Sequence, residues 1–102
     1  MKKIVNLEEF NQVINSEKPV LVDFFAEWCG PCKMQTPILE ALEKEMAIDF
    51  CKINVDELEQ VAINYGISMI PALFLFKNGE VVEKIIGLNT KEELKNKLEK
   101  HI

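Results

Sequence analysis

Residues 19–32 have the sequence PVLVDFFAEWCGPC, a nearly continuous apolar stretch followed by two cysteines three positions apart. β-Branched and aromatic side chains fill its first half, which predicts a strand over residues 19–25 that is buried on both faces. Pro31 suits the first turn of a helix, and a helix is expected over residues 31–46. Its predicted apolar face consists of Met34, Ile38, Leu42 and Met46, flanked by Leu39. The two cysteines therefore lie where a buried strand passes into a helix.

Cys29 lies at the N-terminus of this predicted helix. Free backbone N–H groups and the helix dipole favour negative charge there, so the position favours the reactive thiolate. Cys32 lies one turn further along the same face, at a spacing that permits a disulfide. Cys29 can therefore attack a substrate disulfide, and Cys32 can resolve the mixed disulfide. The alternative is half of a zinc site, but zinc needs four ligands and the chain adds only Cys51 and His101, so no metal is expected.

Three pairs of residues predict helix starts, because each places a glutamate three positions after a capping side chain. The pairs are Asn6 with Glu9, Asp56 with Glu59, and Thr90 with Glu93. The helix that Asp56 and Glu59 predict is expected to end at Gly66. The helix that follows Asn6 is expected to have an apolar face of Leu7, Phe10, Val13 and Ile14. The helix that follows Thr90 is expected to have an apolar face of Leu94, Leu98 and Ile102.

The remaining segments predict strands. They cover residues 3–5, 48–55, 72–76 and 80–86, and Asn78-Gly79 predicts a tight hairpin between the last two. Helices between the early strands imply parallel crossovers. The predicted order is β-α-β-α-β-α-β-β-α, an α/β fold in which helices cover both faces of a mixed central sheet. No linker or repeat divides the chain, so residues 1–102 are expected to form one domain.

The composition limits the function. The 102 residues include 17 acidic and 12 basic residues, for a net charge of −5, and every basic residue is lysine. Nucleic-acid binding, which favours a basic face with arginine, is therefore not expected. No apolar run approaches the roughly 20 residues of a membrane span. Lys2 and Lys3 are not followed by the apolar stretch of a secretion signal, so a cytoplasmic location is expected.

Asp23 interrupts the apolar strand. A carboxylate buried there without a partner would have a raised pKa, whereas an acid at the strand end would face solvent. Lys52, on the strand over residues 48–55, is either a partner of this acid or a surface lysine. Cys51 is expected to be a buried, inert thiol.

The chain resembles the thioredoxin family over nearly its full length. Residues 22–33 match the active-site motif of that family, and residues 52–56, 70–71 and 76–79 match further landmarks in order. The resemblance implies a thioredoxin-like three-layer α/β/α fold and a monomer without a bound cofactor. It also implies a general protein disulfide reductase with a redox-active Cys29–Cys32 disulfide. Its partners would be disulfide-containing proteins and a thioredoxin reductase.

The resemblance further implies roles for single residues. Asp23 would be the buried acid that exchanges a proton with Cys32, and Lys52 would tune its charge. Gly30 and Pro31, between the cysteines, carry no group that stabilises the thiolate, which favours a reductant over an oxidant.

A substrate-docking surface is also implied. It would contain Trp28, Met69, Ile70, Pro71, Ile86 and Gly87, with Val55 and Leu88 adjoining. From the residues alone, core packing is at least as well supported for Val55, Ile86 and Leu88. A trans bond is also favoured at Pro71, because only about 5–6% of X–Pro bonds are cis; the resemblance implies a cis bond. The alternative function is a redox-indifferent adaptor that binds partners through the same surface.

Overall fold

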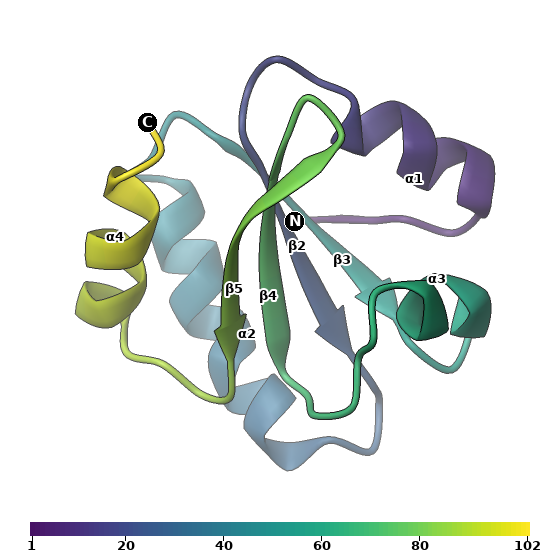
Figure 1. Ribbon diagram of the computed structural model, residues 1–102. Coiled ribbons are helices and arrows are strands. Elements are labelled where there is room, and N and C mark those ends of the chain that lie inside the picture. The colour runs from purple at the N-terminus through teal and green to yellow at the C-terminus, as the bar shows by residue number, and fades with distance from the viewer.

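The computed structural model describes residues 1–102, which are arranged around a five-stranded sheet with strand order β1-β3-β2-β4-β5 (Figure 1). The strands are β1 (Lys2–Lys3), β2 (Val20–Phe25), β3 (Asp49–Asn54), β4 (Ala72–Lys77) and β5 (Glu80–Ile86). β1 and β2 run parallel to β3, whereas β4 runs antiparallel to both β2 and β5. The predicted mixed sheet and the hairpin at Asn78-Gly79 are confirmed.

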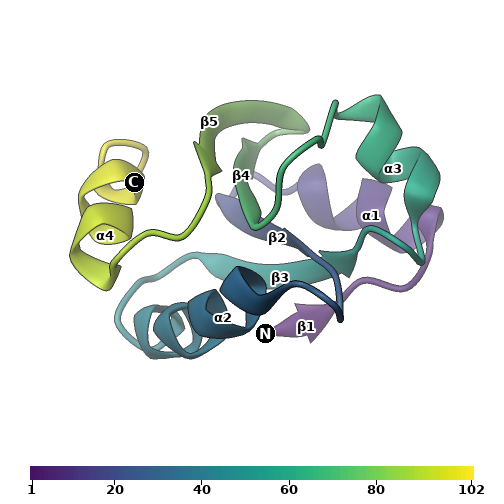
Figure 2. The same ribbon diagram turned by 90° about the horizontal axis from the view of Figure 1, so that it is seen from below.

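Four helices cover the two faces of the sheet. They are α1 (Leu7–Ile14), α2 (Gly30–Glu43), α3 (Glu59–Asn64) and α4 (Lys91–Glu99). α1 and α3 lie on one face, and α2 and α4 lie on the other (Figures 1 and 2). The three-layer α/β/α architecture and the predicted order of elements are therefore confirmed.

The side chains of β2 alternate between these two faces. Val22 and Phe24 pack in the apolar cluster beneath α1 and α3, whereas Leu21 packs in the cluster beneath α2 and α4. Successive side chains of a strand point to opposite faces, so Asp23 lies on the same face as Leu21. Asp23 therefore faces the layer of α2, the helix that carries Cys32.

Two of the three predicted caps are confirmed. The side chain of Asn6 accepts a hydrogen bond from the Glu9 amide at 2.8 Å. Thr90 and Glu93 form a reciprocal capping box at the start of α4. Both helices thus begin where the spacing of polar residues predicts.

The third cap, at Asp56, is wrong. α3 begins at Glu59, and Leu58 precedes it without a side-chain cap. The amides of Glu57 and Leu58 instead donate to the Asn54 carbonyl at 3.0 Å each, forming a turn after β3. The Asp56 carboxylate is engaged elsewhere, by the Trp28 indole.

The predicted helix faces also need correction. Leu7 and Met34 are exposed, and Ile102 lies beyond the end of α4 and is exposed as well. The buried face of α2 consists of Cys32, Gln35, Leu39 and Leu42. These positions have helical spacing. The apolar pattern does not predict them, because a polar glutamine and a cysteine are among them.

Two elements end earlier than expected, the first strand and α2. The first strand comprises only Lys2–Lys3, because pairing with β3 covers just these two positions. α2 ends at Glu43, and the amides of Glu45 and Met46 both donate to the Leu42 carbonyl in the turn that follows.

Candidate active site

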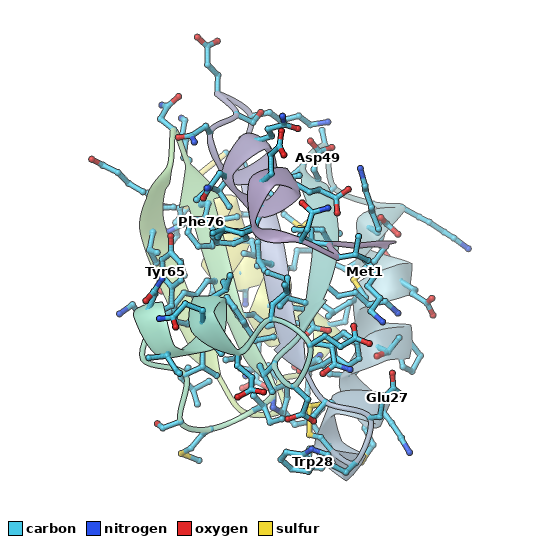
Figure 3. The ribbon with its side chains drawn as sticks, turned by 90° about the vertical axis from the view of Figure 1, so that its right-hand side faces the viewer. Met1, Glu27, Trp28, Asp49, Tyr65 and Phe76 are labelled. Atoms are coloured by element: carbon cyan, nitrogen blue, oxygen red, sulfur yellow. A yellow bond between two sulfur atoms is a disulfide. The ribbon has the colours of Figure 1, made fainter.

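The N-terminus of α2 brings the two cysteines together. Cys29 occupies the N-cap position with extended backbone, and Pro31 lies in the first turn. Sγ of Cys29 and Sγ of Cys32 form a disulfide across a Cα–Cα distance of 5.3 Å. Figure 3 shows this sulfur pair beside Trp28 at one end of the molecule. The strand, the helix start and the cysteine spacing thus coincide as the motif predicts.

Two backbone groups lie against Sγ of Cys29. The amide of Cys32 donates a hydrogen bond to it at 3.2 Å, and the carbonyl oxygen of Ile70 lies 3.8 Å away. In the reduced protein the amide contact would stabilise a thiolate on this sulfur, because an N–H at a helix N-terminus favours an anion.

The loop before β4 forms the opposite side of the site. The Ile70–Pro71 peptide bond is cis, as the resemblance implies and unlike the expectation from residue statistics. The Gly87 amide, just after β5, donates to the Pro71 carbonyl at 2.8 Å. Residues 70–71, residue 87 and the start of α2 therefore meet at the same end of the sheet (Figure 1).

Exposed apolar side chains surround this end. Trp28 is 71% exposed and Met69 is 66% exposed, and Ile86 and Leu88 are also exposed. The core alternative is therefore wrong for Ile86 and Leu88. Val55 is half-buried and packs against the core, so the core alternative holds for it.

The residues nearest the cysteines differ in exposure. Gly30 and Pro31 lie at the surface, whereas Ile70 is half-buried and Pro71 is buried. Ile70 packs beside both cysteines in a small apolar cluster.

Asp23 is buried beneath this site. Only 1% of the residue is exposed, and neither carboxylate oxygen has a hydrogen-bond partner. Burial raises the pKa of Asp23 to about 7, although the positive charge of Lys52 opposes the rise. The solvent-facing alternative is therefore wrong, and this acid can gain or lose a proton near neutral pH.

Lys52 is half-buried on the neighbouring strand, paired in register with Asp23. Its Nζ lies 5.4 Å from the centre of the Phe25 ring. Lys52 also lines a pocket of about 140 Å³ together with Cys32, Phe25 and Thr36. This pocket is wide enough for water and connects the charge of Lys52 with the inner cysteine.

Comparisons with known proteins agree with this geometry. The thioredoxin family model matches residues 1–100. The chain belongs to the thioredoxin family. It is accordingly a thiol-disulfide oxidoreductase whose cysteine pair lies at the active-site position of the family.

Thioredoxins of two Chlamydia species and one solved thioredoxin structure are similar to this chain. A thioredoxin of Chlamydia pneumoniae is 51% identical over 102 residues, which cover 99% of each chain. The thioredoxin of Chlamydia caviae is 47% identical over the same length and coverage. The structure of Plasmodium falciparum thioredoxin superimposes with a TM-score of 0.93 at 37% identity, covering 100% of both chains.

Three residues near the site were not predicted to belong to it. Asp56 accepts a hydrogen bond from Nε1 of Trp28 at 2.8 Å, which orients the exposed indole. Gln35 and Asn89 are buried and bonded to each other. The only local signal was that Gln35 follows Cys32 by one helical turn.

Cys51 is separate from this thioredoxin-family site. It is buried in β3, and burial together with the charges of Asp49 and Asp23 raises the pKa of its thiol to about 12. No group of three or more His, Cys, Asp or Glu side chains is arranged to hold a metal ion. None of the helices combines the length and the apolar character needed to cross a membrane.

Proposed function

We propose that the protein is a general reductant of protein disulfides in which Cys29 is the nucleophile and Cys32 the resolving thiol. The observation that carries the proposal is the contact of the Cys32 amide with Sγ of Cys29 at the N-terminus of α2. A thiolate is the reactive form of cysteine, and this amide and the helix dipole stabilise it on Sγ of Cys29. Gly30 and Pro31 add no further charge there, which keeps the dithiol reducing.

In the first step, the Cys29 thiolate attacks one sulfur of a substrate disulfide. A bond forms between Sγ of Cys29 and that sulfur, the substrate disulfide breaks, and the other substrate cysteine leaves as a thiolate. In the second step, Cys32 loses its proton and attacks Sγ of Cys29. The Cys29–Cys32 disulfide forms, the second substrate thiolate leaves, and two electrons have passed to the substrate.

Asp23 is proposed to accept the proton of Cys32 in the second step. A base is most effective when its pKa lies near the working pH, and burial raises the pKa of Asp23 to about 7. The charge of Lys52 opposes that rise and so tunes the acid. Lys52 lines the same pocket as Cys32, which places the charge that tunes Asp23 near the thiol that must lose its proton.

Substrates are proposed to dock on the apolar surface around the disulfide. Its members are Trp28, Met69, Ile70, Pro71, Ile86 and Gly87. The side chains of Trp28 and Met69 supply exposed area, and the Ile70 carbonyl beside Cys29 faces the place where a substrate sulfur must arrive. An apolar surface with few polar groups suits many different partners.

The protein is further proposed to act as a monomer in the cytoplasm and to be re-reduced by a thioredoxin reductase. A reducing compartment keeps the cysteine pair in its reduced, dithiol form. A monomer leaves the apolar surface free for substrates. The adaptor alternative is not favoured, because the family to which the chain belongs acts on disulfides.

Reduction of insulin by dithiothreitol, followed by turbidity, tests the reductase function. Wild type is expected to accelerate the reaction, and Cys29→Ser and Cys32→Ser are expected to abolish the acceleration. Cys51→Ser is the matched control and should retain it. A folded wild-type protein that does not accelerate insulin reduction would overturn the proposal.

A further inference from the structure

A buried polar pair connects α2 with the loop after β5. Gln35 is 0% exposed and Asn89 is 7% exposed, although both residue types usually lie at protein surfaces. Nε2 of Gln35 donates to the Asn89 carbonyl at 3.1 Å, and the Asn89 amide donates to Oε1 of Gln35 at 2.9 Å. One side chain thus satisfies both backbone groups of a residue 54 positions away.

The Asn89 side chain extends this connection in two directions. Its Nδ2 donates to the Gly87 carbonyl at 3.1 Å, and its Oδ1 accepts from Nζ of Lys97 on α4 at 3.3 Å. The Gly87 amide in turn donates to the Pro71 carbonyl. A continuous chain of hydrogen bonds therefore runs from α2 through the loop to the segment that contacts Cys29.

The loop of residues 87–90 has few other restraints. Thr90 is held by the capping box of α4, and Gly87 by Pro71. The backbone of Leu88 makes no hydrogen bond within the protein, and its side chain is exposed. The position of Leu88 therefore depends on its two neighbours, and the restraint on Asn89 comes from Gln35.

Gln35 lies one turn after Cys32 on the same buried face of α2. The helix that carries the cysteines is thus joined directly to the loop that forms the far side of the docking surface. We propose that Gln35 and Asn89 are positioning residues, which hold the loop of residues 87–88 at a fixed distance from the cysteines so that protein substrates dock productively. This inference rests on the docking surface proposed above.

The proposal predicts a selective defect. A small disulfide reaches Cys29 without touching the loop, whereas a protein substrate must also fit against it. Loss of the Gln35 bonds should therefore slow reduction of a protein and leave reduction of a small disulfide unchanged. A purely structural role would affect neither reaction selectively, as long as the protein stays folded.

The test compares two second-order rate constants for the pre-reduced protein, one with insulin and one with dithiobis(nitrobenzoate). Oxidation is followed by the fluorescence of Trp28, the only tryptophan, for insulin and by the released nitrothiobenzoate for the small disulfide. Gln35→Met removes both bonds at similar side-chain volume. Gln12→Met, the same change at an exposed site on α1, is the matched control.

Gln35→Met is expected to lower the insulin rate about three- to tenfold, because two buried hydrogen bonds are lost. The rate with the small disulfide, and both rates of Gln12→Met, should stay within about twofold of wild type. Asn89→Ala, which leaves the Gln35 bonds intact and removes only the side-chain bonds, should show a smaller selective loss. It provides the test if Gln35→Met does not fold.

An unchanged insulin rate in the folded variants would overturn the inference. An equal fall of the rates with insulin and with the small disulfide would also overturn it, because the substitution would then have changed the reactivity of the thiols. Failure of the proposed docking surface has a different signature. Leu88→Ser and Met69→Ser would then leave the insulin rate of the otherwise wild-type protein unchanged.

Discussion

Two regions of the molecule bury their cysteines almost equally. One is the end of the sheet that carries Cys29 and Cys32, and the other is the middle of β3, which carries Cys51. The three residues are 4%, 2% and 3% exposed, respectively. Each region places a backbone carbonyl near Sγ, but Cys29 also has a backbone amide that donates to its sulfur. Sγ of Cys29 accepts from the Cys32 amide, whereas Sγ of Cys51 donates to the Leu21 carbonyl at 3.6 Å.

This difference shows what makes a buried cysteine reactive. A donor beside the sulfur stabilises the thiolate, whereas a carbonyl acceptor and nearby carboxylates stabilise the thiol. Burial, together with the charges of Asp49 and Asp23, raises the pKa of Cys51 to about 12. Because the cysteines are about equally exposed, the amide donor beside Sγ of Cys29 is what distinguishes the two regions.

The largest expected effect is the trapping of a substrate on Cys29. In Cys32→Ser, the mixed disulfide with insulin cannot be resolved from within the protein, so its lifetime should rise by at least about 10³-fold. Mass spectrometry under non-reducing conditions should find the adduct on the peptide containing Cys29. No adduct should form on Cys51, and Cys51→Ser should show no trapping; accumulation on Cys51 would contradict the contrast.

The next effect concerns Asp23, which shares the cysteine end of the sheet. Between pH about 4 and 7 the unfolded chain releases the proton of this acid while the folded protein retains it, because the folded pKa is raised from 3.8 to about 7. The stability of wild type should therefore fall across this range and level off above it. Asp23→Asn should be more stable by about 4 kcal/mol at pH 8, with the difference vanishing below pH about 4.

Urea unfolding at several pH values measures this difference. Asp49→Asn, at an exposed acid on the adjacent strand, is the control and should change stability by less than about 0.5 kcal/mol at every pH. Asp23→Asn is also expected to slow insulin reduction. A stability difference that does not depend on pH would show that Asp23 is not the titrating group.

Cys51 should matter for packing alone. Cys51→Ala leaves a small cavity in the cluster beneath α1 and α3, which should lower the free energy of unfolding by about 1–2 kcal/mol. Insulin reduction should stay within about twofold of wild type. A large loss of turnover in a folded Cys51→Ala protein would assign this thiol a role in the chemistry.

The smallest effect is expected at Asp56. Asp56→Asn replaces a charge-assisted hydrogen bond to the Trp28 indole with a neutral one, so insulin reduction should fall by less than about threefold. The fluorescence of Trp28 should change measurably. Glu57→Gln, at the adjacent exposed acid, should alter neither property; equal effects of the two substitutions would point to net charge and not to the hydrogen bond.

Much of this molecule could be predicted because its signals are local. The order of elements followed from helix caps such as Thr90 with Glu93, from the hairpin turn, and from apolar runs. The position of the cysteines followed from a strand and a helix that adjoin in sequence. The burial of Asp23 followed from its apolar neighbours in the same strand.

The missed features depend on distant partners. Trp28 and Asp56 lie 28 residues apart, and Gln35 and Asn89 lie 54 residues apart. The hydrogen bonds of a buried glutamine are satisfied only when the fold supplies both a donor and an acceptor. The neighbouring sequence does not indicate where these partners lie. The cap predicted at Asp56 is wrong because an aspartate that accepts from a distant indole can have the same sequence neighbours as one that caps a helix.

Competitive alkylation tests the central contrast most directly. The fully reduced wild-type protein is treated with limiting iodoacetamide at neutral pH, and mass spectrometry measures how fast each cysteine is modified. Cys29 should react first, Cys32 more slowly, and Cys51 at least about 10³-fold more slowly than Cys29. Alkylation of Cys51 at a rate comparable with Cys29 in the folded protein would contradict the account.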